Sequence, residues 1–201
     1  MSASQERARS ENPSGREAQF LERESTRLAL LFLLAIGLRS LAAARVATIF
    51  EDGPRFLAIS SQMAAGHWEQ AFRDSYHPLY SFLIQAIARF TGDPEFVGVA
   101  ISVVAGSLCV CALYAFLRQI WSIEVATVGA FLLAIHPYSI RFSASVQSEA
   151  LYMLLFVGSV ALLLWVLDRP RMGSAVALGV VVGCAYLTRP EGAMVGLLGA
   201  F

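Results

Sequence analysis

The chain contains no lysine and carries little charge of either sign. All fifteen basic residues are arginine, and 15% of the 201 residues are charged, against about 25% in soluble domains. The missing lysine excludes Schiff-base chemistry by a lysine of this chain. Acidic and basic residues balance to a formal net charge of zero, so no global field favours a nucleic-acid partner.

Several catalytic and binding motifs are also missing. The sequence has no glycine-rich phosphate loop, no Gly-x-Ser-x-Gly elbow and no Cys/His spacing typical of structural zinc. These absences argue against nucleotide hydrolysis, serine hydrolase chemistry and structural zinc. The three cysteines, Cys109, Cys111 and Cys184, all lie in apolar blocks. We interpret them as buried small hydrophobic residues.

Long apolar blocks dominate the chain after its first 27 residues. Apolar residues make up 57% of the sequence, above the about 45–50% of soluble domains, and a membrane-spanning helix needs about 20 of them in succession. The sequence therefore predicts an all-α, polytopic membrane protein with about five full transmembrane helices and a truncated sixth that starts at Gly192. The five predicted spans are Leu28–Phe50, Phe96–Leu117, Val125–Ile140, Ala150–Leu167 and Met172–Thr188.

The two ends of the chain differ in character. Residues 1–26 are rich in Ser, Glu and Arg, and such a segment cannot bury enough apolar surface to fold alone. We predict that they form a disordered cytoplasmic tail, and that residues 27–201 form a transmembrane domain. The last apolar block breaks off at Phe201 without a polar tail, so this domain is expected to be the N-terminal part of a longer one.

The first predicted span contains two arginines, Arg39 near its middle and Arg45 near its end. A charge at bilayer depth is unfavourable unless it faces protein or water. We therefore expect Arg39 to face the interior of the bundle. Arg45 either does the same or extends to the lipid headgroups.

The longest polar interval between apolar blocks runs from Phe50 to Tyr80 and opens the first loop, residues 51–95. Apolar residues at helical spacing predict a short amphipathic helix over residues 54–65, with Asp52 at its N-cap and Gly66 at its end. The apolar run at residues 77–90 is short for a span, which favours an interfacial or re-entrant helix.

The arginine distribution orients the chain. If residues 77–90 do not span the membrane, Arg118 and the turn at residues 168–171 lie on the same side as the N-terminal tail. Arginine gathers on the cytoplasmic side, so we predict a cytoplasmic N-terminus and an extracytoplasmic first loop in a plasma or inner membrane. The outer face would then hold Glu51, Asp52, His77, His136, Glu149 and Arg189. If residues 77–90 do span, the charge rule is less well satisfied.

Four residues of the first loop are candidates for a site. The adjacent acids Glu51 and Asp52 can supply a general base and a group that orients a sugar or a cation, although Asp52 would also serve as a simple helix cap. Arg55 follows one helical turn later and either holds a phosphate or pairs with Asp52. His77 stands at a helix start, which attracts anions, but a structural histidine is also common there.

Two further candidates lie later in the chain. Glu149 precedes an apolar block, where an acid also suits the helix dipole. Arg189 lies between two apolar runs, so it either belongs to an ordinary turn or meets an isoprenoid phosphate at the lipid boundary.

Taken in order, these segments resemble the GT-C superfamily of integral membrane glycosyltransferases, especially the protein-mannosyltransferase and aminoarabinose-transferase type. Residues 52–56 (DGPRF) resemble the acidic first-loop motif Asp-Glu-Pro-Arg-Tyr, and residues 77–80 (HPLY) resemble Pro-Pro-Leu-Tyr. Residues 187–192 (LTRPEG) resemble the Leu-Thr-Arg/Lys element of the superfamily, and a later proline, arginine and acid are matched by Pro137, Arg141 and Glu149.

The chain departs from these patterns at two places. Gly53 stands where the family has its second acid, with Glu51 before Asp52 instead. Tyr76 and His77 replace the basic residue that often precedes the Pro-Pro pair. Both departures bear on the identity of donor and acceptor.

The resemblance implies an inverting transfer of a sugar from a polyprenyl-phosphate donor, at the extracytoplasmic face, to a lipid, glycan or protein acceptor. Asp52 would be the general base, and Glu51 and Glu149 would orient the sugar or the acceptor. The departing phosphate would be stabilised by positive groups, namely Arg55 with His77 or Arg189.

No cofactor is expected, because family members that use monophosphate donors generally work without a metal. Glu51, Asp52 and Glu149 could nevertheless supply oxygen ligands for a divalent cation. Two other functions remain open at this point. Arg39 and the short segment at residues 77–90 could belong to a transporter or lipid-carrier flippase, and the chain could be an inactive truncated piece of a GT-C protein. The gathering of acids at one face favours surface chemistry over transport.

Overall fold

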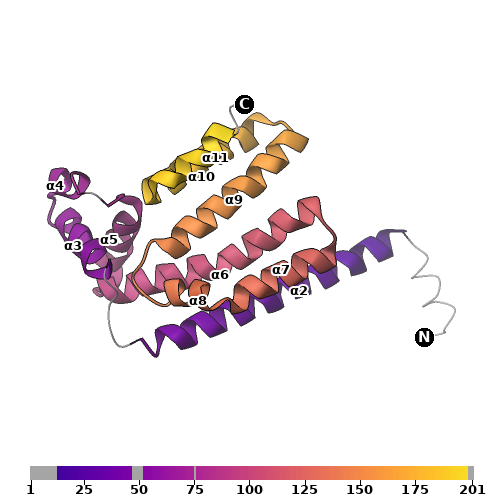
Figure 1. Ribbon diagram of the computed structural model, residues 1–201, viewed down its shortest axis with the longest axis horizontal. Helices are drawn as coiled ribbons and strands as arrows, with labels where there is room; N and C mark the ends of the chain where they lie inside the picture. The colour runs from indigo at the N-terminus through magenta and orange to yellow at the C-terminus, as the bar shows by residue number, and fades with distance from the viewer. Residues whose placement is uncertain (1–12, 47–51, 75, 199–201) are drawn as a thin grey trace.

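The computed structural model shows a helical bundle with a group of shorter helices at one end (Figure 1). It describes residues 13–46, 52–74 and 76–198, without the side chains of residues 13–21 and 198. These residues form helices and no strand, as the sequence predicts. The helices are α2 Pro13–Ala43, α3 Gly53–Ala64, α4 Trp68–Phe72, α5 Leu79–Thr91, α6 Pro94–Ile120, α7 Ile123–Ile135, α8 Pro137–Ser143, α9 Glu149–Asp168, α10 Met172–Thr188, the 3-10 turn η1 Pro190–Gly192 and α11 Ala193–Leu198.

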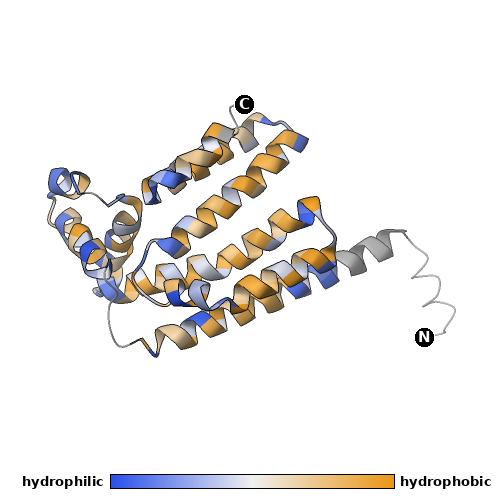
Figure 2. Ribbon diagram, in the orientation of Figure 1, coloured by the Kyte–Doolittle hydropathy of each residue, from blue (hydrophilic) through white to orange (hydrophobic). Residues whose placement is uncertain are grey.

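The longest helices are apolar along most of their length (Figure 2). Among the described residues three helices are long and apolar enough to cross a membrane: Glu22–Ala43 within α2, α6 and α9. The bent pair α7 and α8 adds a fourth if it is counted as one span. These helices confirm a polytopic α-helical membrane protein. The remaining predicted span, α10, has 17 residues and is about 25 Å long, shorter than the about 30 Å hydrocarbon core of a bilayer.

Helix α6 is the centre of the bundle, because α2, α7, α8 and α9 all pack against it. Its contact face is built from small residues, among them Gly98, Ser102, Ala105 and Gly106. A Cβ atom at Gly106 would collide with the Ser143 side chain. Close approach through small residues is how helices associate in lipid, where no hydrophobic force drives them together.

Helix α2 begins earlier than the sequence predicts. Residues 13–26, expected to belong to a disordered tail, are helical and continuous with the first span. Glu24 on this segment accepts hydrogen bonds from the Tyr114 hydroxyl at 3.0 Å and from Arg118 Nε at 2.8 Å. These contacts with α6 stabilise a helical segment that could not fold alone. They cannot be recognised from composition. Residues 1–12 lie outside the described residues.

The predicted span Val125–Ile140 is broken in the structure. α7 ends at Ile135 and α8 begins at Pro137, and the two axes differ by 58°. Pro137 has no backbone N–H to continue the helix and disfavours the helical region at the residue before it. His136 accordingly has ψ 122°, and its Nδ1 accepts a hydrogen bond from the Ser139 N–H at 3.4 Å, which caps α8.

Arg39 faces the interior, as predicted, and is fully buried. Its guanidinium donates to the Ala134 carbonyl at 3.1 Å and to the Ser139 hydroxyl at 2.9 Å, on either side of the α7–α8 break. It also reaches the Ser143 hydroxyl at 3.3 Å. Buried polar groups left without partners are strongly unfavourable, and Arg39 satisfies several at this break. Arg45, by contrast, lies just beyond α2 and is exposed.

The first loop folds into the short helices α3, α4 and α5, which lie at the end of the bundle where α6 begins (Figure 1). α3 confirms the predicted amphipathic helix. Asp52 is at its N-cap position, although its side chain makes no capping hydrogen bond. Gly66 and Gly92 follow α3 and α5 with φ 82° and 78°, a conformation that favours glycine. α5 is not one of the membrane-length helices, and its position at the membrane surface stays a prediction.

Candidate functional site

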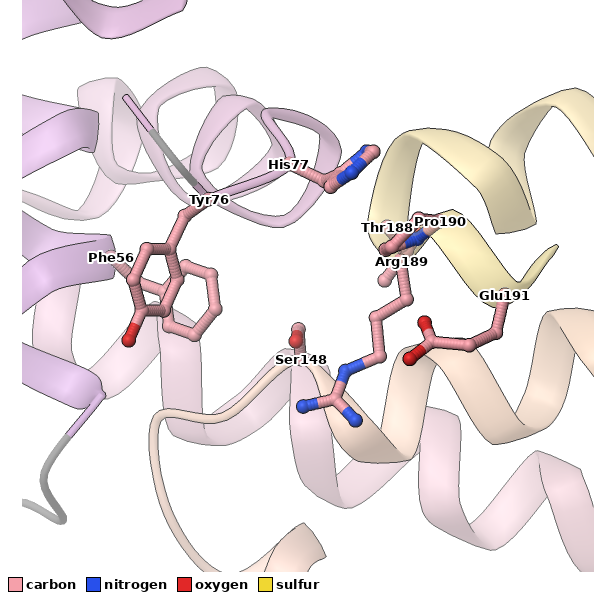
Figure 3. A pocket seen from close by; sticks show the side chains of 8 residues that line it. All are labelled: Phe56, Tyr76, His77, Ser148, Thr188, Arg189, Pro190 and Glu191. Carbon is pink, nitrogen blue, oxygen red and sulfur yellow. The ribbon is translucent and has the colours of Figure 1, made fainter. Parts of the chain in front are cut away.

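A pocket of about 240 Å³ lies where the first loop meets the bundle. It joins segments that are far apart in the sequence: α3, the turn before α5, the start of α9 and the α10–η1 turn (Figure 3). Its lining residues are Phe56, Tyr76, His77, Ser148, Thr188, Arg189, Pro190 and Glu191. Two of the residues predicted from sequence, His77 and Arg189, therefore line one cavity.

Arg189 supplies the positive charge of the pocket. Its Nη2 lies 2.7 Å from Oε1 of Glu149, the first residue of α9, and these side chains are 37% and 15% exposed. Glu149 Oε2 is buried and has no hydrogen-bond partner within the part of the chain that the structure describes. Glu191 lies beside Arg189 in the close view of the pocket (Figure 3). The ion pair joins two predicted site residues that are 40 positions apart.

The turn that carries Arg189 is tightly built. Arg189 itself is extended, with φ −155° and ψ 143°, and Pro190 starts the following 3-10 turn. A Cβ atom at Gly192 would collide with the backbone of Ala185, so only glycine allows η1 to lie so close to the end of α10. This packing holds Arg189 at the end of the bundle that faces the first loop.

Asp52 lies behind the pocket wall. The Tyr76 hydroxyl donates a hydrogen bond to Asp52 Oδ1 at 2.7 Å, and this bond is the main reason why the pKa of Tyr76 is raised. The Tyr76 ring lines the pocket, while its hydroxyl points away from Arg189 (Figure 3). The predicted base and the predicted cation are thus on opposite sides of the Tyr76 ring.

Arg55 is engaged with a residue that the sequence analysis did not single out. Its Nη2 lies 2.6 Å from Asp74 Oδ2, so the structure shows an ion pair with Asp74 and not the pairing with Asp52 that was one of the two alternatives from sequence. Asp74 Oδ1 also accepts the backbone N–H of Tyr76 at 3.2 Å. Arg55 is not among the residues that line the pocket.

His77 lines the pocket near the α10–η1 turn. Its imidazole packs edge-on against Tyr186 of α10, with ring centroids 5.3 Å apart and planes at 79°. This contact ties the start of α5 to the end of α10, near Arg189. The structure thus brings His77, Arg189, Glu149 and Asp52 into or directly behind one pocket wall.

The sequence analysis missed Tyr76 as a partner of Asp52, and it missed Asp74 and Ser148 altogether. For Tyr76 the available signal was that Tyr76 and His77 stand where the resembled family often has a basic residue. Glu51 lies outside the described residues. Among the residues that the structure describes, no group of three or more His, Cys, Asp or Glu side chains is arranged to hold a metal ion.

Membrane-length helices with a small polar pocket at one end define an integral membrane protein whose site opens beside the first loop. Residues 75–201 match the family of dolichyl-phosphate-mannose-protein mannosyltransferases. The match covers more than half of the chain, and the chain belongs to this family. It is a membrane glycosyltransferase of GT-C type, which confirms the resemblance stated from sequence. The matched segment contains His77, Glu149 and Arg189 but not Asp52. No curated protein matches the chain.

Proposed function

We propose that the protein transfers a sugar from a polyprenyl-phosphate donor to an acceptor hydroxyl at the extracytoplasmic face, with inversion at the anomeric carbon. The observation that supports this most is the arrangement around the pocket. Arg189 and the ring of Tyr76 line the pocket, and Asp52 lies behind that ring, bonded to the Tyr76 hydroxyl. A cation for the leaving group and a base for the nucleophile are the two groups that such a transfer needs.

Arg189 would bind the donor phosphate. A guanidinium has five N–H donors, and the contact with Glu149 Oε1 engages Nη2. The remaining donors can meet phosphate oxygens while the Glu149 contact keeps the plane oriented. His77 lines the same cavity and can add a hydrogen bond or a positive charge. Both groups would stabilise the charge that develops as the phosphate departs.

Asp52 would accept the proton of the acceptor hydroxyl. The acceptor oxygen forms a bond to the anomeric carbon while the bond from that carbon to the phosphate oxygen breaks. The proton goes to Asp52 and the bonding pair leaves with the lipid phosphate. Attack opposite the leaving group inverts the centre. A positioned base contributes roughly 10²–10⁴-fold to such a reaction.

The size of the pocket suits a headgroup rather than a whole lipid. Its volume of about 240 Å³ is below the about 300–1,000 Å³ of sites that enclose drug-sized ligands. The polyprenyl tail would stay in the bilayer, next to apolar helices such as α10. Glu149, and Glu51 from outside the described residues, would orient the sugar or the acceptor. Arg55 would contribute through its ion pair with Asp74.

Asp52→Asn tests the proposed base. In the full-length protein in lipid vesicles, transfer from a labelled polyprenyl-phosphate sugar should fall about 100-fold or more, while binding of that donor is retained. Asp168→Asn is the matched control, because Asp168 is 74% exposed at the far end of α9 and should transfer normally. Undiminished transfer by Asp52→Asn would remove Asp52 from this role.

A further inference from the structure

A ring of contacts starts at the side chain of Asp52 and closes through the backbone of the first turn of α3. Tyr76 donates its hydroxyl to Asp52 Oδ1, and the backbone N–H of Tyr76 is held by Asp74 Oδ1. Asp74 Oδ2 forms an ion pair with Arg55. Arg55 lies on α3, one helical turn after Asp52, so the ring closes there. The ring thus joins the first turn of α3 to the segment that leads into α5.

Two acids, Asp52 and Asp74, are close enough in the fold to be considered as ion-pair partners of Arg55, and the structure pairs it with Asp74. Asp52 and Arg55 have the spacing of a helical ion pair, and such a pair would draw the Asp52 carboxylate toward the arginine. Asp74 takes that arginine instead, at 2.6 Å, with a side chain that is only 9% exposed. A partly buried ion pair with an added hydrogen bond is a firmer partner than an exposed one. Among the residues that the structure describes, the side chain of Asp52 is then bonded to a neutral donor, Tyr76.

Tyr76 is itself held by a chain of aromatic contacts that ends on the membrane helix α6. Its ring packs edge-on against Phe56 with centroids 5.1 Å apart, and Phe56 packs in the same way against Tyr80 at 5.0 Å. The Tyr80 hydroxyl donates to the Gly98 carbonyl at 2.8 Å and lies 2.8 Å from the Ser102 hydroxyl. The position of the Tyr76 hydroxyl is therefore set by the bundle rather than by the loop alone.

We infer that Tyr76 and Asp74 are positioning residues for the transfer reaction, which aim the Asp52 carboxylate at the acceptor. This inference rests on the proposed function. Tyr76 fixes Oδ1 by its hydroxyl, so that Oδ2 is the oxygen that receives the proton. Asp74 removes Arg55 from the carboxylate and fixes the backbone of Tyr76. Neither residue contacts the donor phosphate, which belongs to Arg189 on the other side of the Tyr76 ring.

The test compares Tyr76→Phe, Asp74→Asn, Asp52→Asn and the double variant Asp52→Asn/Tyr76→Phe in the full-length protein in lipid vesicles. Tyr76→Phe keeps the ring that packs on Phe56 and removes only the donor. We expect kcat to fall about 10-fold or more, the effect of one hydrogen bond to a charged group. The dissociation constant of the polyprenyl-phosphate sugar should change less than about twofold. Asp74→Asn should show the same division between kcat and binding without a change in the aromatic stack.

The double variant separates positioning from a general structural role. If Tyr76 acts through Asp52, the double variant should transfer no more slowly than Asp52→Asn alone. Wild-type kcat in Tyr76→Phe and Asp74→Asn, a weakening of donor binding that parallels the loss of kcat, or a further loss in the double variant would each overturn the inference. Normal transfer by Asp52→Asn would instead overturn the proposed base itself, so the two failures are distinguishable.

Discussion

At the scale of single residues, Arg189 is the cation whose removal should separate phosphate binding from proton transfer. Arg189→Lys keeps the charge but loses the planar fork that matches both a carboxylate and a phosphate. We expect the KM for the polyprenyl-phosphate donor to rise about 10-fold, the loss of one charge-assisted hydrogen bond. Arg189→Gln should raise it further. Initial rates at varied donor concentration measure this.

Arg73→Gln is the matched control for Arg189. Arg73 also forms an ion pair with a glutamate, Glu69, at 2.6 Å, but both side chains are 79% exposed on α4. Exposed pairs of this kind contribute little, so donor KM should stay at the wild-type value. An equal rise in KM for the Arg73 and Arg189 variants would show that the effect is one of general surface charge and not of the pocket.

At the scale of elements, Arg39 satisfies the polar groups that are exposed at the break between α7 and α8. The guanidinium is fully buried and donates to the Ala134 carbonyl and the Ser139 hydroxyl across the break. Arg39→Leu leaves these groups unsatisfied, which costs about 1–3 kcal/mol for each buried group. We therefore expect a clearly lower apparent unfolding temperature in detergent, and a smaller loss for Arg39→Lys, which keeps one donor group.

Arg45 provides the comparison within the same helix end. It lies just beyond α2 and is exposed, so Arg45→Leu should leave the apparent unfolding temperature close to that of the wild type. Similar losses for Arg39→Leu and Arg45→Leu would contradict the assignment of Arg39 to the α7–α8 break.

Sequence reasoning placed Arg39 correctly in the interior because a mid-membrane charge has few alternatives. It did not foresee the break, because it treated residues 125–140 as one apolar span, although Pro137 is a signal for a break there.

At the scale of the whole molecule, composition and motif order predicted the membrane helices and several residues around the pocket. They did not predict which side chains contact each other. The apolar blocks fix where α6 and α9 lie, since a membrane helix has little else to specify it. The motif order brought out His77, Glu149 and Arg189, which meet around one pocket. The exchange of partners in which Asp74 takes Arg55 and Tyr76 takes Asp52 was not predictable. It depends on how α3 and α5 pack against each other, and periodicity does not describe that packing.

The orientation of the whole molecule leads to a labelling prediction. The site end of the bundle carries α4 with the exposed Glu69, and the opposite end carries the turn after α9 with the exposed Asp168. Arg23 and Arg27 of α2 lie at the same opposite end as Arg118, which contacts Glu24 there. The preference of arginine for the cytoplasmic side therefore predicts that the pocket lies on the extracytoplasmic side.

Single cysteines at positions 69 and 168 report on which side of the membrane each end of the bundle lies. They are introduced after Cys109, Cys111 and Cys184 have been replaced by alanine or serine. In intact cells a membrane-impermeant maleimide should label Glu69→Cys and leave Asp168→Cys unlabelled. After permeabilisation both should react, because both positions are exposed. The reverse pattern would put the pocket on the cytoplasmic side, where a donor presented at the outer face could not reach Arg189. Transfer would then require a donor on the inner face. Adding the polyprenyl-phosphate sugar to only one side of lipid vesicles that contain the full-length protein tests this.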